Sequence, residues 1–285
     1  MVACALLVLA GVAAVVRWSH LPFQALSQSA PATAGQRYLW NVTVAVTAGL
    51  AAGVLVAGAG GRLAMRVLAV TAGDGAQGKI TEASEVVGRI TVDGTIGFLM
   101  FTGLFFGLAS GVLYALLRRW LPPGRLGGLA FGALLLVVAG TRLEPLRADN
   151  PDFDLVGPSW LALTLFAALA LIHGLVLAAV AARVSRTLPL FSIRSRRGLG
   201  YAPLLALLPI FPVYLVMAVA GVLTVAVSRM GPGPRTGIGV PAGGSGEPGL
   251  DRATLIAGRA VLIGIVLVAL PGFVSTVADI AGRGP

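Results

Sequence analysis

The sequence predicts an all-α polytopic transmembrane helix bundle with about seven spanning helices and an external charged cap. Of the 285 residues, 57% are hydrophobic and only 11% are charged, whereas soluble globular domains carry roughly 25% charge. The mean hydropathy is +0.92. Apolar segments recur along the whole chain without a long polar block between them. We therefore expect residues 1–285 to form a single membrane domain.

The individual spans follow from the length of each apolar segment. A spanning helix needs about 20 mostly apolar residues to cross a hydrocarbon core about 30 Å thick. The predicted spans are residues 2–16, 38–59, 93–117, 126–141, 159–182, 201–228 and 253–277, of which the first and the fourth are short. Residues 230–249 are rich in Gly and Pro, which predicts a flexible external loop.

The distribution of charge predicts how the chain is oriented. One set of loops carries arginines without any acid, and the opposite set mixes basic residues with all the acids except Asp279. The positive-inside rule places the acid-free side in the cytoplasm, with the N-terminus outside and the C-terminus inside. Of the 21 basic residues only Lys79 is a lysine, and Ala, Gly and Val are abundant. This bias is typical of GC-rich bacterial genomes, so we expect the bacterial plasma membrane.

Glycines repeat at four-residue spacing in three of the predicted spans. They are Gly49 and Gly53 in the second, Gly103, Gly107 and Gly111 in the third, and Gly124, Gly128 and Gly132 in the fourth. Such a stripe lets two helix backbones approach closely, which drives helix association in lipid. We expect helix packing through Gly103, Gly107 and Gly111, with the second to fourth helices in a tight inner cluster. The alternative is a chance pattern in a Gly-rich sequence.

The most polar external region is residues 60–93. Arg62 and Arg66 are four residues apart, and this predicts a short amphipathic helix on the outer surface. Glu82, Glu85 and Arg89 fall on one helical face, where Glu85 and Arg89 can pair. Two interpretations remain open. The charges either pair with one another to fasten the cap, or Glu82 and Glu85 form an acidic ligand or cation site gripped by Arg62 and Arg66.

A second acidic cluster lies between the fourth and fifth spans and includes Asp149 and Asp152. Alternating oxygen ligands suit calcium, but the Glu that closes an EF-hand loop is missing, because Trp160 stands eleven places after Asp149. We expect a turn whose acids cap the next helix, with no metal bound. Asp149 and Asp152 remain secondary candidates for a ligand or ion site.

Part of the chain resembles a group of multi-pass membrane proteins from actinobacteria and related bacteria. The resemblance rests on GGRLAMRVLAVTAGD, ITEASEVVGRITVDGTIGF and ADNPDFDLVGP, and it covers residues 60–174. The resemblance implies a bacterial membrane setting. It implies no particular activity and therefore no mechanism.

His173 is the ionisable residue nearest the middle of a predicted span, and such residues are functional candidates because burying them is costly. The competing explanation is a neutral histidine bonded to a neighbouring helix. Ser110 is expected at similar depth, which resembles the serine and histidine dyad of rhomboid proteases. Leu108 replaces the glycine of that motif, and no oxyanion-hole pair is evident, so we expect no catalytic residue here.

These features favour a transport or permeation component, because His173 lies deep and the external mouth is charged. The alternative is a structural or regulatory subunit of a membrane complex, and a membrane-embedded enzyme ranks third. No cofactor is expected, because the last span lacks a lysine for retinal, a single mid-span histidine does not suit haem, and no phosphate-binding loop occurs. The expected partners are the lipid bilayer and either other membrane proteins or further copies of the chain. The arginines sit beside apolar segments, which argues against nucleic acid.

Overall fold

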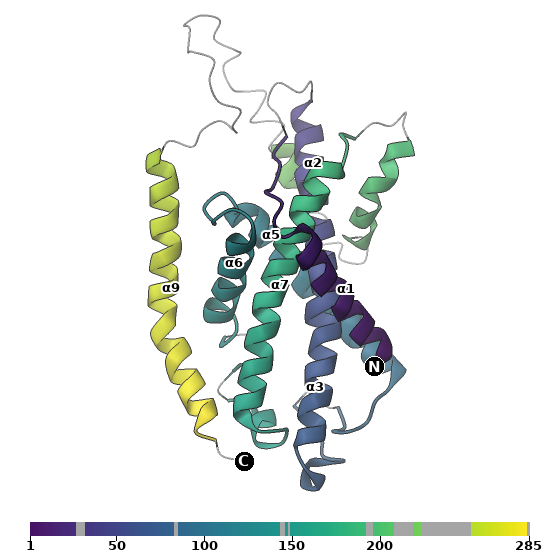
Figure 1. Cartoon of the computed structure of the whole chain (residues 1–285), viewed down its shortest axis with the longest axis vertical. Helices are drawn as coiled ribbons and strands as arrows, with labels where there is room; N and C mark the ends of the chain where they lie inside the picture. The colour runs from purple at the N-terminus through teal and green to yellow at the C-terminus, as the bar shows by residue number, and fades with distance from the viewer. Residues whose placement is uncertain are drawn as a thin grey trace, which may run out of the picture.

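The fold is a bundle of helices in a computed structural model that describes residues 1–26, 32–82, 85–142, 146–147, 149–191, 196–207, 219–223 and 252–283 (Figure 1). Four helices are long and apolar enough to cross a membrane, namely Ala34–Thr71, Val92–Leu117, Ser159–Thr187 and Arg252–Ala281. Two shorter apolar helices, α1 (Val2–Trp18) and α6 (Arg125–Val138), accompany them. The all-α prediction is therefore confirmed for the described residues, whereas a bundle of seven spans is not.

Two of the long helices are composite. The first joins α2 (Ala34–Ala52), the π-helical turn η1 (Gly53–Gly58) and α3 (Ala59–Thr71). The second joins α4 (Val92–Phe98), the π-helical turn η3 (Leu99–Phe106) and α5 (Gly107–Leu117). A threonine caps each start, because Thr33 Oγ1 accepts a hydrogen bond from Gln36 N at 3.2 Å and Thr91 Oγ1 accepts one from Gly94 N at 3.1 Å. The helices α7 (Ser159–Thr187) and α9 (Arg252–Ala281) are unbroken.

The two composite helices cross backbone to backbone where their π-helical turns meet. A Cβ atom added at Gly107 would lie 2.5 Å from the carbonyl oxygen of Gly49, and one at Gly53 would lie 2.6 Å from the Cα of Gly107. Gly103 and Gly111 belong to the same contact, facing Gly53 and Gly49. Only residues without a side chain permit this approach, so the glycines fix the distance between the helices.

A second glycine contact joins α6 to α7. A Cβ atom at Gly132 would lie 2.5 Å from the carbonyl oxygen of Ala170, and one at Gly174 would lie 2.6 Å from the backbone nitrogen of Gly132. The expected cluster of the second, third and fourth predicted helices is therefore wrong in one respect. The fourth helix, α6, uses its glycines against α7 rather than against α2 and α5, because Gly174 offers the matching small surface.

The segment with Arg62 and Arg66 is part of the bundle and not a separate surface helix. It forms α3, which continues α2 without a break and packs against α1 and α7. Gly60 allows this contact, because a Cβ atom there would lie 2.5 Å from a methyl carbon of Leu169. The two arginines lowered the local hydropathy of the sequence, and that hid the continuity of the helix.

The predicted sixth span, residues 201–228, is not a membrane-length helix in its described parts. Residues 196–207 form the 3₁₀ helix η5 (Arg196–Leu207), and residues 219–223 form a short helical piece. Leu207 packs against Val46 of α2, and Gly221 faces the ring of Tyr38 near the start of the same helix. The rest of this span, with Pro209 and Pro212, and the predicted external loop 230–249 lie outside the described residues.

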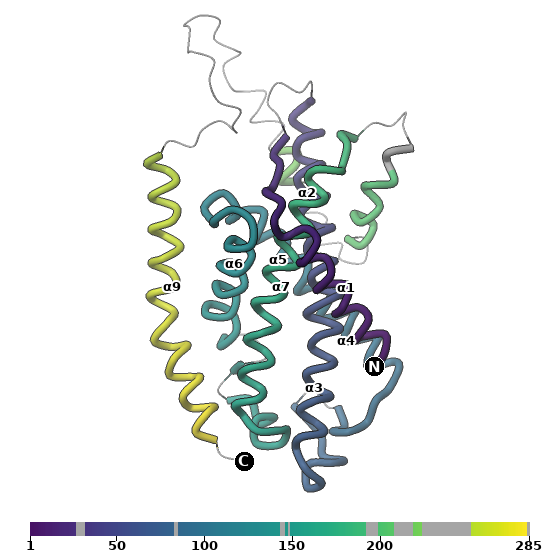
Figure 2. The backbone as a smooth tube through the Cα atoms, in the orientation of Figure 1, coloured from purple at the N-terminus to yellow at the C-terminus, as the bar shows by residue number. Residues whose placement is uncertain are grey.

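The predicted sides of the membrane for the two termini stay a prediction, and the structure shows what the C-terminal end of the chain contacts. The C-terminal end of α9 docks on the loop before α7, where the backbone oxygen of Arg283 accepts a hydrogen bond from Ser159 Oγ at 3.0 Å and its guanidinium lies 3.8 Å from Asp154. The trace in Figure 2 places the N-terminus in the same half of the molecule.

A substitution at the crossing tests the packing. Gly107→Ala places a methyl group against a backbone carbonyl that cannot yield without separating the helices, so we expect a loss of about 1–3 kcal/mol of stability. Gly264→Ala in α9 is the matched control, because nothing lies within 4 Å of its added Cβ. Thermal unfolding in detergent measures both variants. Equal midpoints for the two would contradict the role of the crossing.

Candidate functional site

The buried polar centre of the bundle is a hydrogen bond between two helices. His173 lies in the middle of α7, and its Nε2 atom is 2.8 Å from Ser110 Oγ on α5. The two residues are 1% and 3% exposed. Ser110 Oγ also lies 3.0 Å from the carbonyl oxygen of Gly107, to which it can donate. The bond therefore fastens α7 to α5 directly beside the glycine crossing.

Apolar groups enclose the rest of the imidazole. The ring of Phe106, the last residue of η3, lies 5.1 Å from it between centroids. The other ring nitrogen, Nδ1, is buried and interacts with the backbone of Ala52, although no partner in the described part of the chain reaches regular hydrogen-bond geometry. Ala52 is itself fully buried. Among the described residues, His173 is thus almost completely buried by packed side chains.

Both π-helical turns adjoin this histidine. Ala52 immediately precedes η1, and Phe106 ends η3. Turns of this kind occur often at functional sites, because the extra residue re-aims backbone groups. Here both turns lie where the glycines of the two helices meet, and Ala52 and Phe106 lie beside the imidazole.

The chemistry open to this pair is limited by what surrounds it. A distance of 2.8 Å between Ser110 and His173 suits proton transfer from a nucleophilic serine. Acyl transfer also needs backbone or side-chain donors for an oxyanion and a path for substrate and water. Ser110 lies inside a helix, and both side chains are buried. The arrangement supports a hydrogen-bonded tie between helices and not a hydrolytic site.

The candidate residues of the predicted cap meet at a different centre, Arg147. Its guanidinium forms an ion pair with Glu82 and another with Asp149 at 2.8 Å. Asp152 adds a link, because its Oδ1 accepts a hydrogen bond from Glu82 N at 2.9 Å. The two loops expected to carry separate clusters therefore form one clamp, which we call the cap clamp and which consists of Glu82, Arg147, Asp149 and Asp152.

The remaining cap candidates lie beside the clamp. Arg66 donates from Nη1 to the carbonyl oxygen of Gly88 at 3.2 Å, and Arg62 stacks over Phe98 at 5.7 Å from the ring centroid. Arg62 and Glu85 converge on Gly94, each having an atom 3.1 Å from the position of a Cβ there. The structure thus places Arg62 near Glu85, and neither Arg62 nor Arg66 is the partner of Glu82.

An apolar cluster lies between the cap and the long helices. Its buried members are Leu68, Leu146, Phe153, Ala162 and Ile280. They come from α3, the loop before α7, η4 (Pro151–Asp154), α7 and α9. The cap is thus joined to three long helices. Among the described residues, no group of three or more His, Cys, Asp or Glu side chains could hold a metal ion.

Sequence reasoning missed Arg147 as the centre of the cap. It stands 65 residues from Glu82 in the chain, and helical spacing relates only residues three or four apart. One signal was available. Arg147 directly precedes a run of acids that includes Asp149 and Asp152, so a local ion pair could have been expected.

The fold and the site define a class: in its described residues the chain is all-helical, with four helices long and apolar enough to cross a membrane and a buried hydrogen bond between two of them. Comparison with family models, with curated proteins and with solved structures finds no match. The function is therefore argued from the geometry of this chain alone.

Removing the hydroxyl of Ser110 tests the central tie. Ser110→Ala leaves Nε2 of His173 in a dry core without its partner, so we expect a loss of about 1 kcal/mol. Ser275→Ala on the exposed part of α9 is the control, because its hydroxyl contacts only the backbone of its own helix. Unfolding midpoints in detergent report both. Wild-type stability of the Ser110→Ala variant would show that the bond between Ser110 and His173 does not stabilise the bundle.

The cap clamp is tested at Arg147. Arg147→Gln removes two ion pairs at once, each partly exposed and worth about 0–1 kcal/mol. We expect global stability to change little and limited proteolysis within residues 74–91 to become faster. Arg142→Gln, an exposed arginine on the same loop, is the matched control. Unchanged cleavage of the Arg147 variant would show that the clamp does not hold the two loops together.

Proposed function

We propose that this chain is a non-enzymatic structural or regulatory subunit of a complex in the bacterial plasma membrane. The observation that carries the proposal is the burial of His173, which is 1% exposed and bonded to Ser110. A transporter would use a mid-membrane ionisable group in a water-reachable cavity. In this chain His173 is instead buried and bonded to Ser110 of another helix.

The glycine crossings support the same proposal. At Gly49, Gly53 and Gly107 the helix backbones touch, and a single added carbon would clash. A permeation path along these helices would have to separate them at that point. The arrangement suits a rigid scaffold, whose helices stay at a fixed distance.

The outer helix α9 leaves most of its apolar surface uncovered by the rest of the bundle. It packs on α6 and α7, but only 6% of its apolar window is buried in the bundle. Exposed side chains along it include Val261, Leu267 and Val268. In a membrane such a face meets lipid or another helix, and helix packing with a partner subunit is the use consistent with the proposal.

Charge supports an orientation for the proposed subunit. All acids of the described residues lie toward the cap, while the opposite end carries arginines and no described acid. The positive-inside rule then favours the arginine end in the cytoplasm, with the cap and both termini outside.

A flux assay separates the proposed function from transport. We expect proteoliposomes with wild-type protein and with His173→Gln to be equally impermeable to protons and small solutes. A wild-type flux that His173→Gln abolishes, while the variant stays folded, would favour the transport hypothesis.

The complex itself is tested by cross-linking in native membranes followed by purification of the tagged chain. The expected result is a complex of fixed stoichiometry with another membrane protein or further copies of this chain. Recovery of the monomer alone would contradict the proposed role.

Orientation is tested with single cysteines in a Cys4→Ala background. Gly75→Cys in the cap should react with a membrane-impermeant maleimide added from outside, and Leu199→Cys, which is 79% exposed in the wild type and lies in η5, should not. The reverse pattern would invert the orientation.

A further inference from the structure

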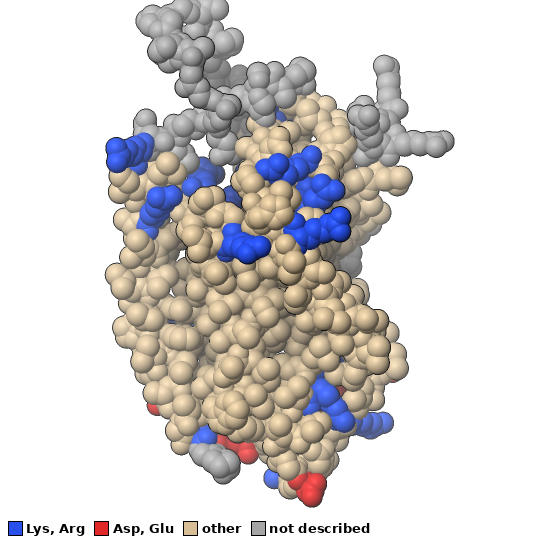
Figure 3. Space-filling model, in the orientation of Figure 1, with Lys and Arg blue, Asp and Glu red and all other residues tan. Residues whose placement is uncertain are grey.

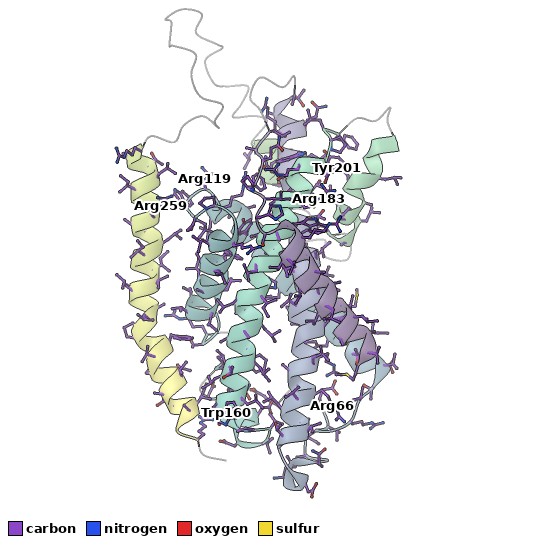
Figure 4. All side chains as sticks on the ribbon, in the orientation of Figure 1. Arg66, Arg119, Trp160, Arg183, Tyr201 and Arg259 are labelled. Atoms are coloured by element: carbon purple, nitrogen blue, oxygen red, sulfur yellow. The ribbon has the colours of Figure 1, made fainter. Side chains whose placement is uncertain are left out.

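The end of the bundle opposite the cap is strongly basic. Its described arginines are Arg17, Arg37, Arg118, Arg119, Arg125, Arg183, Arg186, Arg252 and Arg259. Figure 3 shows basic side chains gathered over this end, and Figure 4 shows Arg119, Arg183 and Arg259 there, with Arg66 and Trp160 at the other end. No acid of the described residues lies among them, so the described part of this end carries a net positive charge.

Three of these arginines are held in the same way. Arg125 donates from Nε to Ser19 Oγ at 2.7 Å, Arg186 donates from Nε to the carbonyl oxygen of Pro22 at 3.1 Å, and Arg259 donates from Nε to the carbonyl oxygen of Trp120 at 3.3 Å. Each bond joins two segments far apart in sequence. All three residues are exposed.

This geometry leaves the terminal nitrogens for an external anion. Within the described residues, no carboxylate lies within ion-pair distance of Arg125, Arg186 or Arg259. The Nη atoms of arginine form a planar pair of donors that matches two oxygens of a phosphate group. Because Nε is already bonded, each guanidinium is oriented before the anion arrives, which lowers the entropy cost of binding.

The surroundings indicate where that phosphate comes from. Leu126, directly after Arg125, is 65% exposed, and Ile256 and Val261, which flank Arg259 on α9, are 59% and 61% exposed. Basic groups beside exposed apolar side chains suit a molecule with an anionic head and acyl chains. A free phosphate or a nucleotide would gain nothing from the apolar neighbours.

We propose that Arg125, Arg186 and Arg259 bind the phosphate headgroups of anionic phospholipids at the arginine end of the bundle. The Nε bonds orient the guanidinium groups, and the exposed apolar side chains beside Arg125 and Arg259 contact the acyl chains. This site is independent of the proposed role as a subunit, and it requires only that the chain lie in a bilayer.

The test compares lipid retention in nanodiscs that contain equal amounts of phosphatidylglycerol and phosphatidylcholine, read by native mass spectrometry of the released protein. Wild-type protein should retain phosphatidylglycerol preferentially, by about fivefold or more. Changing all three arginines to Gln should abolish the preference. Changing all three to Lys keeps the charge but removes both the Nε bond and the planar donor pair, so most of the preference should be lost as well.

The control carries Arg89→Lys and Arg142→Lys at the cap end and should keep the wild-type preference. If a triple variant does not fold, the three single Arg→Lys variants are measured instead. Each should lose part of the preference for phosphatidylglycerol. Three results would overturn the proposal: no preference in the wild type, full preference in the Lys variants, or displacement of the lipid by millimolar inorganic phosphate, which would indicate a soluble-anion site.

Discussion

The contact of helix backbones at glycine is the constraint on which the rest of this structure depends. In a membrane the lipid is as apolar as the side chains, so helices associate through close packing and polar contacts rather than through the hydrophobic effect. The contact of Gly49 and Gly53 with Gly103, Gly107 and Gly111 supplies that packing. It sets the position of α5 relative to α2, and the bond between Ser110 and His173 lies directly beside it.

The helix α7 converts this pair into a bundle. It contacts α1, α2, α3, α6 and α9, and its own glycine contact with α6 mirrors the first crossing. His173 and Gly174 are adjacent in sequence but face different neighbours, since His173 bonds to Ser110 and Gly174 meets Gly132. One turn of α7 thus links both glycine contacts. The hydrogen bond between His173 and Ser110 fixes the register of α7 against α5, which contacts between glycines alone would not fix.

The features of the structure that depend on local spacing could be predicted from the sequence. The glycine repeats, the depth of His173 and the similar depth of Ser110 could all be read from positions along single helices. Their pairing across helices could not, because it depends on how helices far apart in the sequence pack against one another. The same limit explains why Glu82 was expected near Arg62 and Arg66, when its partner Arg147 reaches it from another loop. The number of spans stays a prediction as well, because most of residues 201–228 lies outside the described residues.

The central claim is that the core around His173 is dry and holds the helices together. Water accessibility at Ser110 tests it most directly, through Ser110→Cys in a Cys4→Ala background, with Arg142→Cys as the exposed reference. A small methanethiosulfonate reagent should modify the reference rapidly and leave position 110 unmodified from either side of the membrane until the protein is unfolded. Rapid modification of position 110 in folded protein would mean that water reaches the histidine, and it would contradict the account.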